Sequence, residues 1–307
     1  MPPPLSASSS TAGVLAILLA ALLWGSTGTA ASFAPQANPM AIGAFAMGIG
    51  GLLQALLAYP HLLRQWQQLR QYPVLIMMGA LAVAVYPLAF YSAMRLAGVT
   101  VGTVVTIASA PLATAIIERL FGTTNPMNRR WYSSLLAGTV GIVLLTQPVS
   151  GVVDTSGLAQ NQDQNHLTGV FLGLLAGVTY ALYSWLAANL IRQGIRSEAA
   201  MAALFLPATA LLLLSLLWTA DQLFADRSGT LAIVYITLVP MWLGYLAFGY
   251  GLRHIDAARA TLLTLFEPVV AAVLAVWVVG EQLAWSGWLG IALIGVCLAI
   301  QTTAGRR

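Results

Sequence analysis

Ten long apolar runs, separated by short polar turns, constrain what this chain can fold into. Each run is close to the roughly 20 residues that a helix needs to cross the hydrocarbon core of a bilayer. Only 7% of the 307 residues are charged, against roughly 25% in soluble domains. A soluble fold could not bury this much apolar surface, so we expect an all-α integral membrane protein. The expected spans are 12–33, 39–59, 72–94, 99–121, 131–147, 167–191, 198–219, 230–252, 257–280 and 284–302.

Composition also excludes several kinds of site. The single cysteine, Cys297, lies inside an apolar run, which excludes an internal disulfide and a thiolate metal cluster. The three histidines lie far apart and show no metal-ligand spacing. We therefore expect no metal and no cofactor. The basic residues are scattered near the ends of apolar runs, so the pI near 9.5 does not indicate a nucleic-acid partner.

The arginines predict the orientation in the membrane. If both termini are cytoplasmic, eleven of the 13 basic residues lie inside and two, Arg95 and Arg227, lie outside. The positive-inside rule therefore favours cytoplasmic N- and C-termini. The inside residues are Arg64, Arg70, Arg119, Arg129, Arg130, Arg192, Arg196, Arg253, Arg259, Arg306 and Arg307.

The longest loop divides the chain into two similar halves. We expect a flexible N-terminal tail over 1–11, which lacks the basic residues of a cleaved signal peptide. Five helices follow over 12–147, then an extracytoplasmic linker over 148–166, five more helices over 167–303 and a cytoplasmic tail over 304–307. The stretch from Arg95 to Pro111 resembles that from Arg253 to Pro268. Because five is odd, the second half runs inverted, the usual plan of secondary transporters.

Several short motifs support one family. Residues 23–26 read Leu-Trp-Gly-Ser, residues 265–268 read Leu-Phe-Glu-Pro, and residues 280–283 read Gly-Glu-Gln-Leu. With the ten spans, they resemble the EamA-type transporters of the drug/metabolite transporter superfamily, over nearly the whole chain. This superfamily includes nucleotide-sugar carriers and the branch of YddG-like amino-acid exporters. The chain departs from the family pattern at residues 122–123, where Gly-Thr stands in place of Gly-Glu. The resemblance implies a bacterial inner-membrane location.

Glu267 is the acidic residue expected deepest in the membrane. It lies ten residues past Ala257, about 15 Å into a core about 30 Å thick. An ionisable side chain at that depth is costly and indicates function by default. It could bind a substrate amine, carry a coupling proton, or support the local helix break. Glu118, in contrast, is expected to face the membrane interface beside Arg119.

Two prolines occupy matching places in the halves. Proline inside a helix removes one backbone hydrogen bond and frees a carbonyl group. Pro111 and Pro268 are therefore expected to form hinges or to line a cavity, although neighbouring hydroxyls could simply relieve each kink.

Aromatic and hydroxyl side chains within the spans are expected to line the same cavity. Tyr86 and Trp242 lie too deep for an interfacial belt, while Thr103, Thr106 and Ser109 share one helix face. Each residue could instead be satisfied locally. The expected cavity residues are Trp24, Ser26, Tyr86, Tyr91, Thr106, Ser109, Tyr183, Trp242, Tyr245 and Glu267. Gly169, Gly173 and Gly177 predict a close packing seam, either inside the fold or between protomers.

Taken together, these features favour a secondary transporter that exports a small neutral or zwitterionic metabolite, amino acids foremost. Arg-rich cavities suit phosphate, and no arginine lies in the middle of a span. Alternatives are lipid-like or drug-like compounds and nucleotide sugars. An intramembrane enzyme or a channel is disfavoured, because paired acids, deep histidines and repeated polar rings are missing. The expected partners are the substrate and the bilayer, with a monomer or a homodimer both open.

Overall fold

The computed structural model describes residues 7–97, 99–121, 128–145, 147, 162–280 and 282–303. All regular elements in these ranges are helical, which confirms the all-α prediction. They are α1 (Ala7–Ala31), α2 (Pro39–Arg64), α3 (Trp66–Leu69), α4 (Pro73–Ala97), α5 (Val99–Leu120), α6 (Arg129–Leu145), α7 (Gln162–Arg192), α8 (Ser197–Thr219), α9 (Arg227–Ile236), the π-helix η1 (Thr237–Gly244), α10 (Tyr245–Gly251), α11 (Ala257–Leu263), α12 (Phe266–Leu274), the π-helix η2 (Ala275–Val279) and α13 (Trp285–Thr303).

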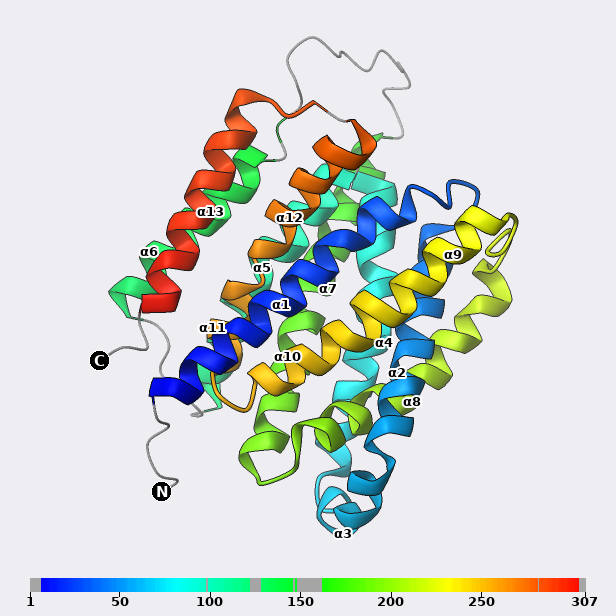
Figure 1. Ribbon diagram of the computed structural model, residues 1–307, viewed down its shortest axis with the longest axis vertical. Coiled ribbons are helices and arrows are strands. Elements are labelled where there is room, and N and C mark those ends of the chain that lie inside the picture. The colour runs from blue at the N-terminus through cyan, green and yellow to red at the C-terminus, as the bar shows by residue number, and fades with distance from the viewer. Residues whose placement is uncertain are drawn as a thin grey trace.

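Nine segments of the described chain are long and apolar enough to cross a membrane. Two of them are composite: α9, η1 and α10 form Arg227–Gly251, and α11, α12 and η2 form Ala257–Val279. The expected fifth span, 131–147, forms α6, which has 17 residues and packs along α13 (Figure 1).

The helix contacts follow an approximate twofold relation between the halves. The second expected span packs on the seventh (α2 on α8), and the fifth packs on the tenth (α6 on α13). Contacts of α4 and α5 with α7 are mirrored by contacts of α10 and α12 with α1. The fourth and ninth spans meet directly through α5 and α11. Each half therefore completes the packing of the other, as an inverted repeat requires.

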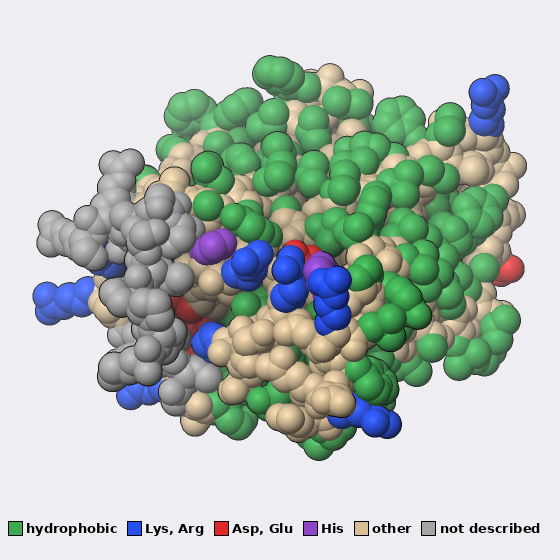
Figure 2. All heavy atoms as spheres, turned by 60° about the horizontal axis from the view of Figure 1, so that its bottom comes forward, with side chains coloured by type: hydrophobic (Ala, Val, Ile, Leu, Met, Phe, Trp, Pro, Cys, Tyr) green, Lys and Arg blue, Asp and Glu red, His purple; other side chains and the backbone are tan. Residues whose placement is uncertain are grey.

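Both ends of the described chain lie at one end of the bundle, which we call the terminal face (Figure 1). The Arg259 guanidinium donates to the Gln301 carbonyl at 2.6 Å and to the Ser10 hydroxyl at 3.3 Å, so the start of α1 and the end of α13 are neighbours. Arginine side chains gather on this face between the helix ends (Figure 2). Arg95 and Arg227, in contrast, lie where α4 ends and α9 begins, at the opposite face.

Two expected loop segments are partly helical. Helix α1 begins at Ala7, inside the expected tail 1–11, and α7 begins at Gln162, inside the expected linker 148–166. Both extensions continue the same apolar helix by one or two turns beyond the membrane-length run. Residues 1–6, 148–161 and 304–307, Gly122, Thr123 and Glu281 lie outside the described residues.

The glycine stripe of α7 forms a seam inside the fold. A Cβ added to Gly169 would lie 2.5 Å from the Ala97 nitrogen, and one added to Gly177 would lie 2.8 Å from the Thr106 carbonyl. Bare glycine backbone thus lets α7 lie directly against the end of α4 and against α5. This contact joins the two halves beside the candidate site.

Candidate functional site

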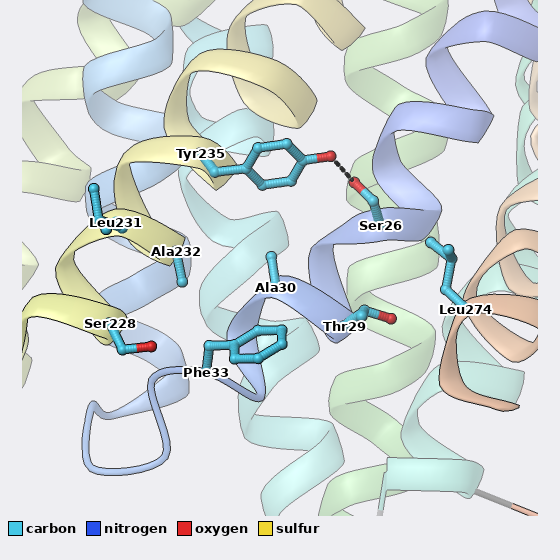
Figure 3. Close-up of a pocket in the computed structure, with 9 residues that line it drawn as sticks. All are labelled: Ser26, Thr29, Ala30, Phe33, Ser228, Leu231, Ala232, Tyr235 and Leu274. Atoms are coloured by element: carbon cyan, nitrogen blue, oxygen red, sulfur yellow. Dashed lines mark hydrogen bonds between the residues drawn. The ribbon is translucent and has the colours of Figure 1, made fainter. Parts of the chain in front are cut away.

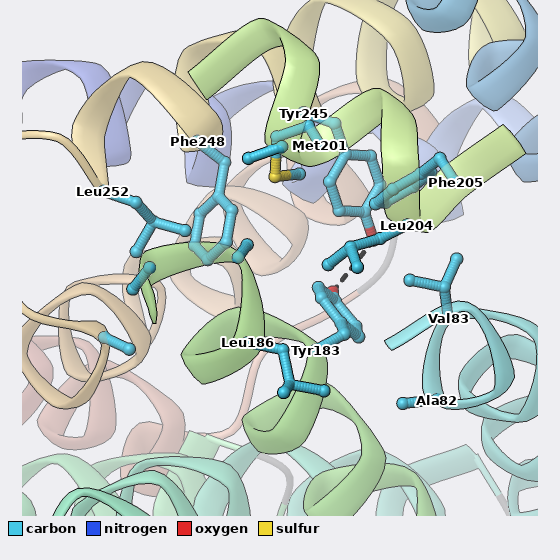
Figure 4. Close-up of a cluster of buried hydrophobic side chains, with 14 of the residues drawn as sticks. Ala82, Val83, Tyr183, Leu186, Met201, Leu204, Phe205, Tyr245, Phe248 and Leu252 are labelled. Carbon is cyan, nitrogen blue, oxygen red and sulfur yellow. Dashed lines mark hydrogen bonds between the residues drawn. The ribbon is translucent and has the colours of Figure 1, made fainter. Parts of the chain in front are cut away.

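Aromatic rings from several helices pack together inside the bundle, and Figure 4 shows four of them, Tyr183, Phe205, Tyr245 and Phe248. Trp24 of α1 lies 4.8 Å from Tyr245 and 5.3 Å from Phe248 between ring centroids. Tyr180 links this group to Tyr86 of α4 at 5.6 Å. We call the following residues the aromatic cluster: Trp24, Tyr86, Phe90, Tyr91, Tyr180, Tyr183, Phe205, Tyr245 and Phe248. It draws on both halves of the chain.

Three phenol groups of the cluster, those of Tyr180, Tyr183 and Tyr245, are hydrogen-bonded to other hydroxyls. Tyr183 and Tyr245 share a hydrogen bond of 3.1 Å between their hydroxyl oxygens, drawn as a dashed line in Figure 4. The Tyr180 hydroxyl lies 2.9 Å from the Thr264 hydroxyl, which in turn donates to the Thr261 carbonyl at 2.8 Å. These pairs satisfy polar groups that would otherwise be costly to bury. They also join α7 to α10 and to the turn between α11 and α12.

Glu267 faces this cluster from α12. Its carboxylate is half-buried and lies within electrostatic range of the hydroxyls of Tyr86, Tyr91, Tyr180 and Tyr245. It stands near the middle of the 23-residue segment Ala257–Val279. No other acidic side chain of the described residues lies near the middle of a span. The site therefore offers one acidic group surrounded by aromatic faces and hydroxyls.

A helix break positions Glu267. Pro268 has no N–H to bond the Thr264 carbonyl one turn back. That carbonyl instead accepts the Glu267 N–H at 2.9 Å, and α11 ends at Leu263 while α12 starts at Phe266. The tightened turn therefore places Glu267 in the first turn of α12. Pro111 behaves differently, because α5 runs through it without interruption.

Three consecutive residues of α1 contact different elements around the site. The Trp24 indole N–H donates to the Pro240 carbonyl of η1 at 3.0 Å. A Cβ on Gly25 would lie 2.7 Å from the Glu267 carbonyl, so only glycine lets α1 and α12 approach this closely. The Ser26 hydroxyl lies 2.9 Å from the Tyr235 hydroxyl of α9.

A pocket of about 420 Å³ opens beyond the Ser26–Tyr235 pair, towards the face opposite the terminal face (Figure 3). Its walls come from the end of α1, the start of α9 and the end of α12. The lining residues are Ser26, Thr29, Ala30, Phe33, Ser228, Leu231, Ala232, Tyr235 and Leu274. The bundle is therefore hollowed at the end of α1 that lies farthest from the terminal face.

Besides Ser26, which lines the pocket, and Glu267, three expected cavity residues lie outside the cluster. The Thr106 hydroxyl donates to the Gly173 carbonyl at 3.1 Å, and Ser109 donates to the Thr106 carbonyl at 3.2 Å. Both therefore belong to the seam between α5 and α7. Trp242 makes no ring contact with the cluster, and its buried indole N–H has no hydrogen-bond partner among the described residues.

The expected cavity set did not include Tyr180, Phe90, Phe205, Phe248 or Thr264. Helical spacing could have found two of them, because Tyr180 precedes Tyr183 by three residues and Phe248 follows Tyr245 by three. Phe205 gives no such signal, since its ring reaches Tyr245, at 4.7 Å, only through the packing of α8. In the described residues, no group of three His, Cys, Asp or Glu side chains could hold a metal ion.

Glu118 corrects an expectation. It does not face the membrane interface: its side chain is fully buried at the end of α5, where its Oε1 accepts hydrogen bonds from Ala257 and Ala258. A carboxylate can be buried at this place because the first turn of α11 offers it unpaired N–H groups.

The fold and the central site define a multi-pass membrane transporter. The sequence profile of the EamA-like transporter family matches residues 11–147 and 167–302. The chain belongs to this family, within the drug/metabolite transporter superfamily. Each half of the chain thus carries one copy of the family repeat.

Relatives and one solved structure agree with this assignment. The uncharacterized transporter YwfM of Bacillus subtilis strain 168 is 32% identical over 298 residues, covering 95% of this chain and 94% of that protein. The uncharacterized inner membrane transporter YicL of Salmonella typhimurium strain LT2 is 23% identical, covering 93% of each chain. A crystal structure of a protein 22% identical in sequence shares the fold, with a TM-score of 0.79 over 98% of this chain and 99% of that one. The protein is a multi-pass protein of a bacterial inner membrane.

Proposed function

We propose that this transporter exports small neutral or zwitterionic metabolites, amino acids foremost, by alternating access around the aromatic cluster. The observation that carries the proposal is Glu267, a half-buried carboxylate at mid-span that interacts electrostatically with four tyrosines from both halves. An ionisable side chain at this depth is costly, and such residues occur where the side chain faces a ligand, a proton path or water.

The chemistry of the site favours a substrate with an amine and an apolar side chain. The carboxylate pairs with an ammonium group, and tyrosine and tryptophan faces attract cations and pack against rings. Paired phenol hydroxyls can reorient towards a substrate carboxylate. A phosphorylated substrate would meet an acidic group in a cluster with no arginine among its residues, which disfavours it.

We further propose ten spans with both termini in the cytoplasm. This proposal is supported by Arg259, which bonds both the start of α1 and the end of α13, as expected for a chain that crosses the membrane an even number of times. Helix α6 then makes the tenth crossing: its 17 residues extend about 25 Å and it packs along α13. The arginine-rich terminal face is the cytoplasmic one by the positive-inside rule.

Counterflow tests the substrate class. Liposomes containing the purified protein are preloaded with one unlabelled compound from a panel of aromatic, neutral, acidic and basic amino acids, sugars and nucleosides. Labelled compound is then added outside at low concentration. We expect saturable uptake against the gradient for aromatic or neutral amino acids. Uptake of only nucleosides or sugars by well-folded protein would refute the proposed class.

Glu267→Gln tests the role of the carboxylate. The change keeps the shape and removes the charge, and losing a hydrogen bond to a charged group lowers affinity roughly tenfold or more. We expect counterflow to fall by about that factor if Glu267 binds the substrate amine. If it carries a proton instead, counterflow persists and accumulation driven by a pH gradient is lost. Glu198→Gln, at the start of α8 and paired with Arg196, is the matched control and should transport normally.

A further inference from the structure

The N-terminus of α11 is capped by a residue from the other half of the chain. Glu118 Oε1 accepts the Ala257 N–H at 2.9 Å and the Ala258 N–H at 3.3 Å. The next two N–H groups, of Arg259 and Ala260, bond the side chain and the carbonyl of Asp256 at 2.7 and 2.9 Å. The Ala260 bond is the first one within the helix, so Glu118 satisfies two of the three N–H groups, those of Ala257, Ala258 and Arg259, that α11 itself leaves without a partner.

The charge of Glu118 is compensated within the same region. The positive end of the α11 dipole favours an anion at this place. The Arg192 guanidinium at the end of α7 also interacts electrostatically with Glu118 and Asp256. A buried carboxylate that is bonded and compensated in this way costs most when its partners leave. Separating α5 from α11 would therefore leave a buried carboxylate without the two hydrogen bonds that it accepts from α11.

Polar contacts continue from Glu118 towards the candidate site. One turn deeper, the Thr261 hydroxyl donates to the Thr114 hydroxyl at 3.3 Å, and Thr114 shares the α5 face of Glu118. Thr264 lies directly after the end of α11, three residues before Glu267, and its hydroxyl is hydrogen-bonded to that of Tyr180. Exposed fractions along this column are 0% for Glu118 and Thr114, 1% for Thr261 and 2% for Thr264. We call these four residues the polar seam.

The polar seam lies where motion between the halves must act. Helices α5 and α11 belong to the fourth and ninth spans, which are equivalent in the two repeats, so their contact lies on the approximate twofold axis. A rocking motion of one repeat against the other changes this contact directly. Apolar packing would be at least as stable in a static core. A polar seam differs because water can satisfy the same groups when the helices part.

We propose that Glu118 is a positioning residue that keeps the transport path closed at the terminal face, and that transport requires the polar seam between α5 and α11 to open. We call the contact of Glu118 with the start of α11 the latch. This inference rests on the proposed alternating-access function. In the structure the latch is closed at the terminal face, while the Ser26–Tyr235 pocket is hollowed towards the opposite face. Unlatching would admit water along the seam as far as Thr264, next to Glu267.

A thiol-accessibility measurement tests the latch without any substrate. The chain has one cysteine, the buried Cys297, so Cys297→Ala gives a cysteine-free background. Thr261→Cys then places a thiol in the middle of the polar seam. The rate of its modification by a charged, membrane-impermeant methanethiosulfonate is measured on the intact protein in nanodiscs. With Glu118 in place we expect slow modification. With Glu118→Gln or Glu118→Asp we expect a rate at least about tenfold higher, because the charge or the reach of the cap is lost.

Glu198→Gln provides the matched control. It makes the same substitution at the start of α8, where Glu198 is partly exposed and paired with Arg196, and it should leave the rate unchanged. An unchanged rate in folded Glu118→Gln and Glu118→Asp would overturn the latch. An equal rise in Glu198→Gln would also overturn it, because the effect would then be a general loosening.

A second variant decides the matter if the Glu118 variants do not fold. Thr114→Cys with Thr261→Cys, in the same background, replaces two hydroxyls that lie 3.3 Å apart. Oxidation with copper phenanthroline joins the two thiols across the seam. We expect the disulfide to abolish counterflow and a reductant to restore it. Full counterflow through the disulfide-bonded protein would overturn the proposal. If the reduced double variant and the wild-type protein both move no compound of the panel, the proposed substrate class fails; the latch then fails separately if the thiol reagent modifies the oxidised double variant as slowly after reduction as before it.

Discussion

Trp24, Gly25 and Ser26 show how three neighbouring residues fix the site. They lie on different sides of α1. Trp24 contacts η1 at Pro240, Gly25 contacts α12 at Glu267, and Ser26 contacts α9 at Tyr235. Each contact depends on a different property: an indole donor, the lack of a side chain, and a small hydroxyl. Helix α1 can therefore hold the two composite spans at a fixed distance around the aromatic cluster.

Gly25→Ala tests this close approach. The added Cβ would lie 2.6 Å from the Val270 Cβ and 2.7 Å from the Glu267 carbonyl oxygen, so α1 and α12 must move apart. Overpacking of this kind costs about 1–3 kcal/mol. We expect a lower melting temperature in detergent, measured by the loss of monodisperse protein on heating.

Gly28→Ala is the control for that experiment. Gly28 lies one turn further along α1, and an added Cβ there meets nothing within 4 Å. Because alanine favours helix more than glycine does, this variant should melt at the wild-type temperature or slightly above. Equal destabilisation by both changes would show that the contact with α12 does not explain the effect.

At the scale of elements, the ninth span differs from its counterpart, the fourth. Both contain a central proline, yet α5 is continuous through Pro111, while α11 and α12 are separated at Thr264 and Leu265. The Glu267 N–H takes over the carbonyl that Pro268 cannot bond. The break thereby places a carboxylate, a threonine hydroxyl and the end of the polar seam within one turn.

Replacing each proline with alanine compares the two spans. Pro268→Ala supplies an N–H that competes for the Thr264 carbonyl, which favours a continuous helix and turns Glu267 away from the cluster. We expect counterflow to slow several-fold without a loss of thermal stability. Pro111→Ala, in an unbroken helix, should slow it less. A larger effect at Pro111 would mean that the flexible element is α5.

At the scale of the whole molecule, the halves are packed through one another. The pairs α2 with α8 and α6 with α13 join equivalent spans, and α7 lies against both α4 and α5. Helices α2, α6 and α7 therefore pack mainly against the other half. The Arg259 contacts then bring both ends of the chain to one face.

Reporter fusions test the proposed orientation. We expect green fluorescent protein fused after Arg307 to fluoresce in cells, and alkaline phosphatase fused there to be inactive, because the first matures in the cytoplasm and the second outside it. The converse pair should hold for fusions truncated after residue 225, in the loop between α8 and α9. An active phosphatase at the C-terminus would place the terminal face outside the cytoplasm and would overturn the proposed orientation.

The sequence determines the class of the protein and most of its elements. Run length and the scarcity of charge predict membrane helices, because the bilayer imposes a fixed length and a high cost on charge. The depth of Glu267 follows from its position within its apolar run, and the two halves follow from the five runs on each side of the longest loop. Helix periodicity could also have added Tyr180 and Phe248 to the cavity residues.

Only the tertiary structure decided which polar groups meet. Thr106 and Ser109 have the pattern of a cavity face, yet α7 covers them, because its glycines allow backbone contact. Glu118 has the position of an interfacial residue, yet it is buried against a helix end 139 residues away in the chain. A sequence pattern specifies which face of a helix is polar. Which helix covers that face depends on contacts between distant segments, and local periodicity carries no record of them.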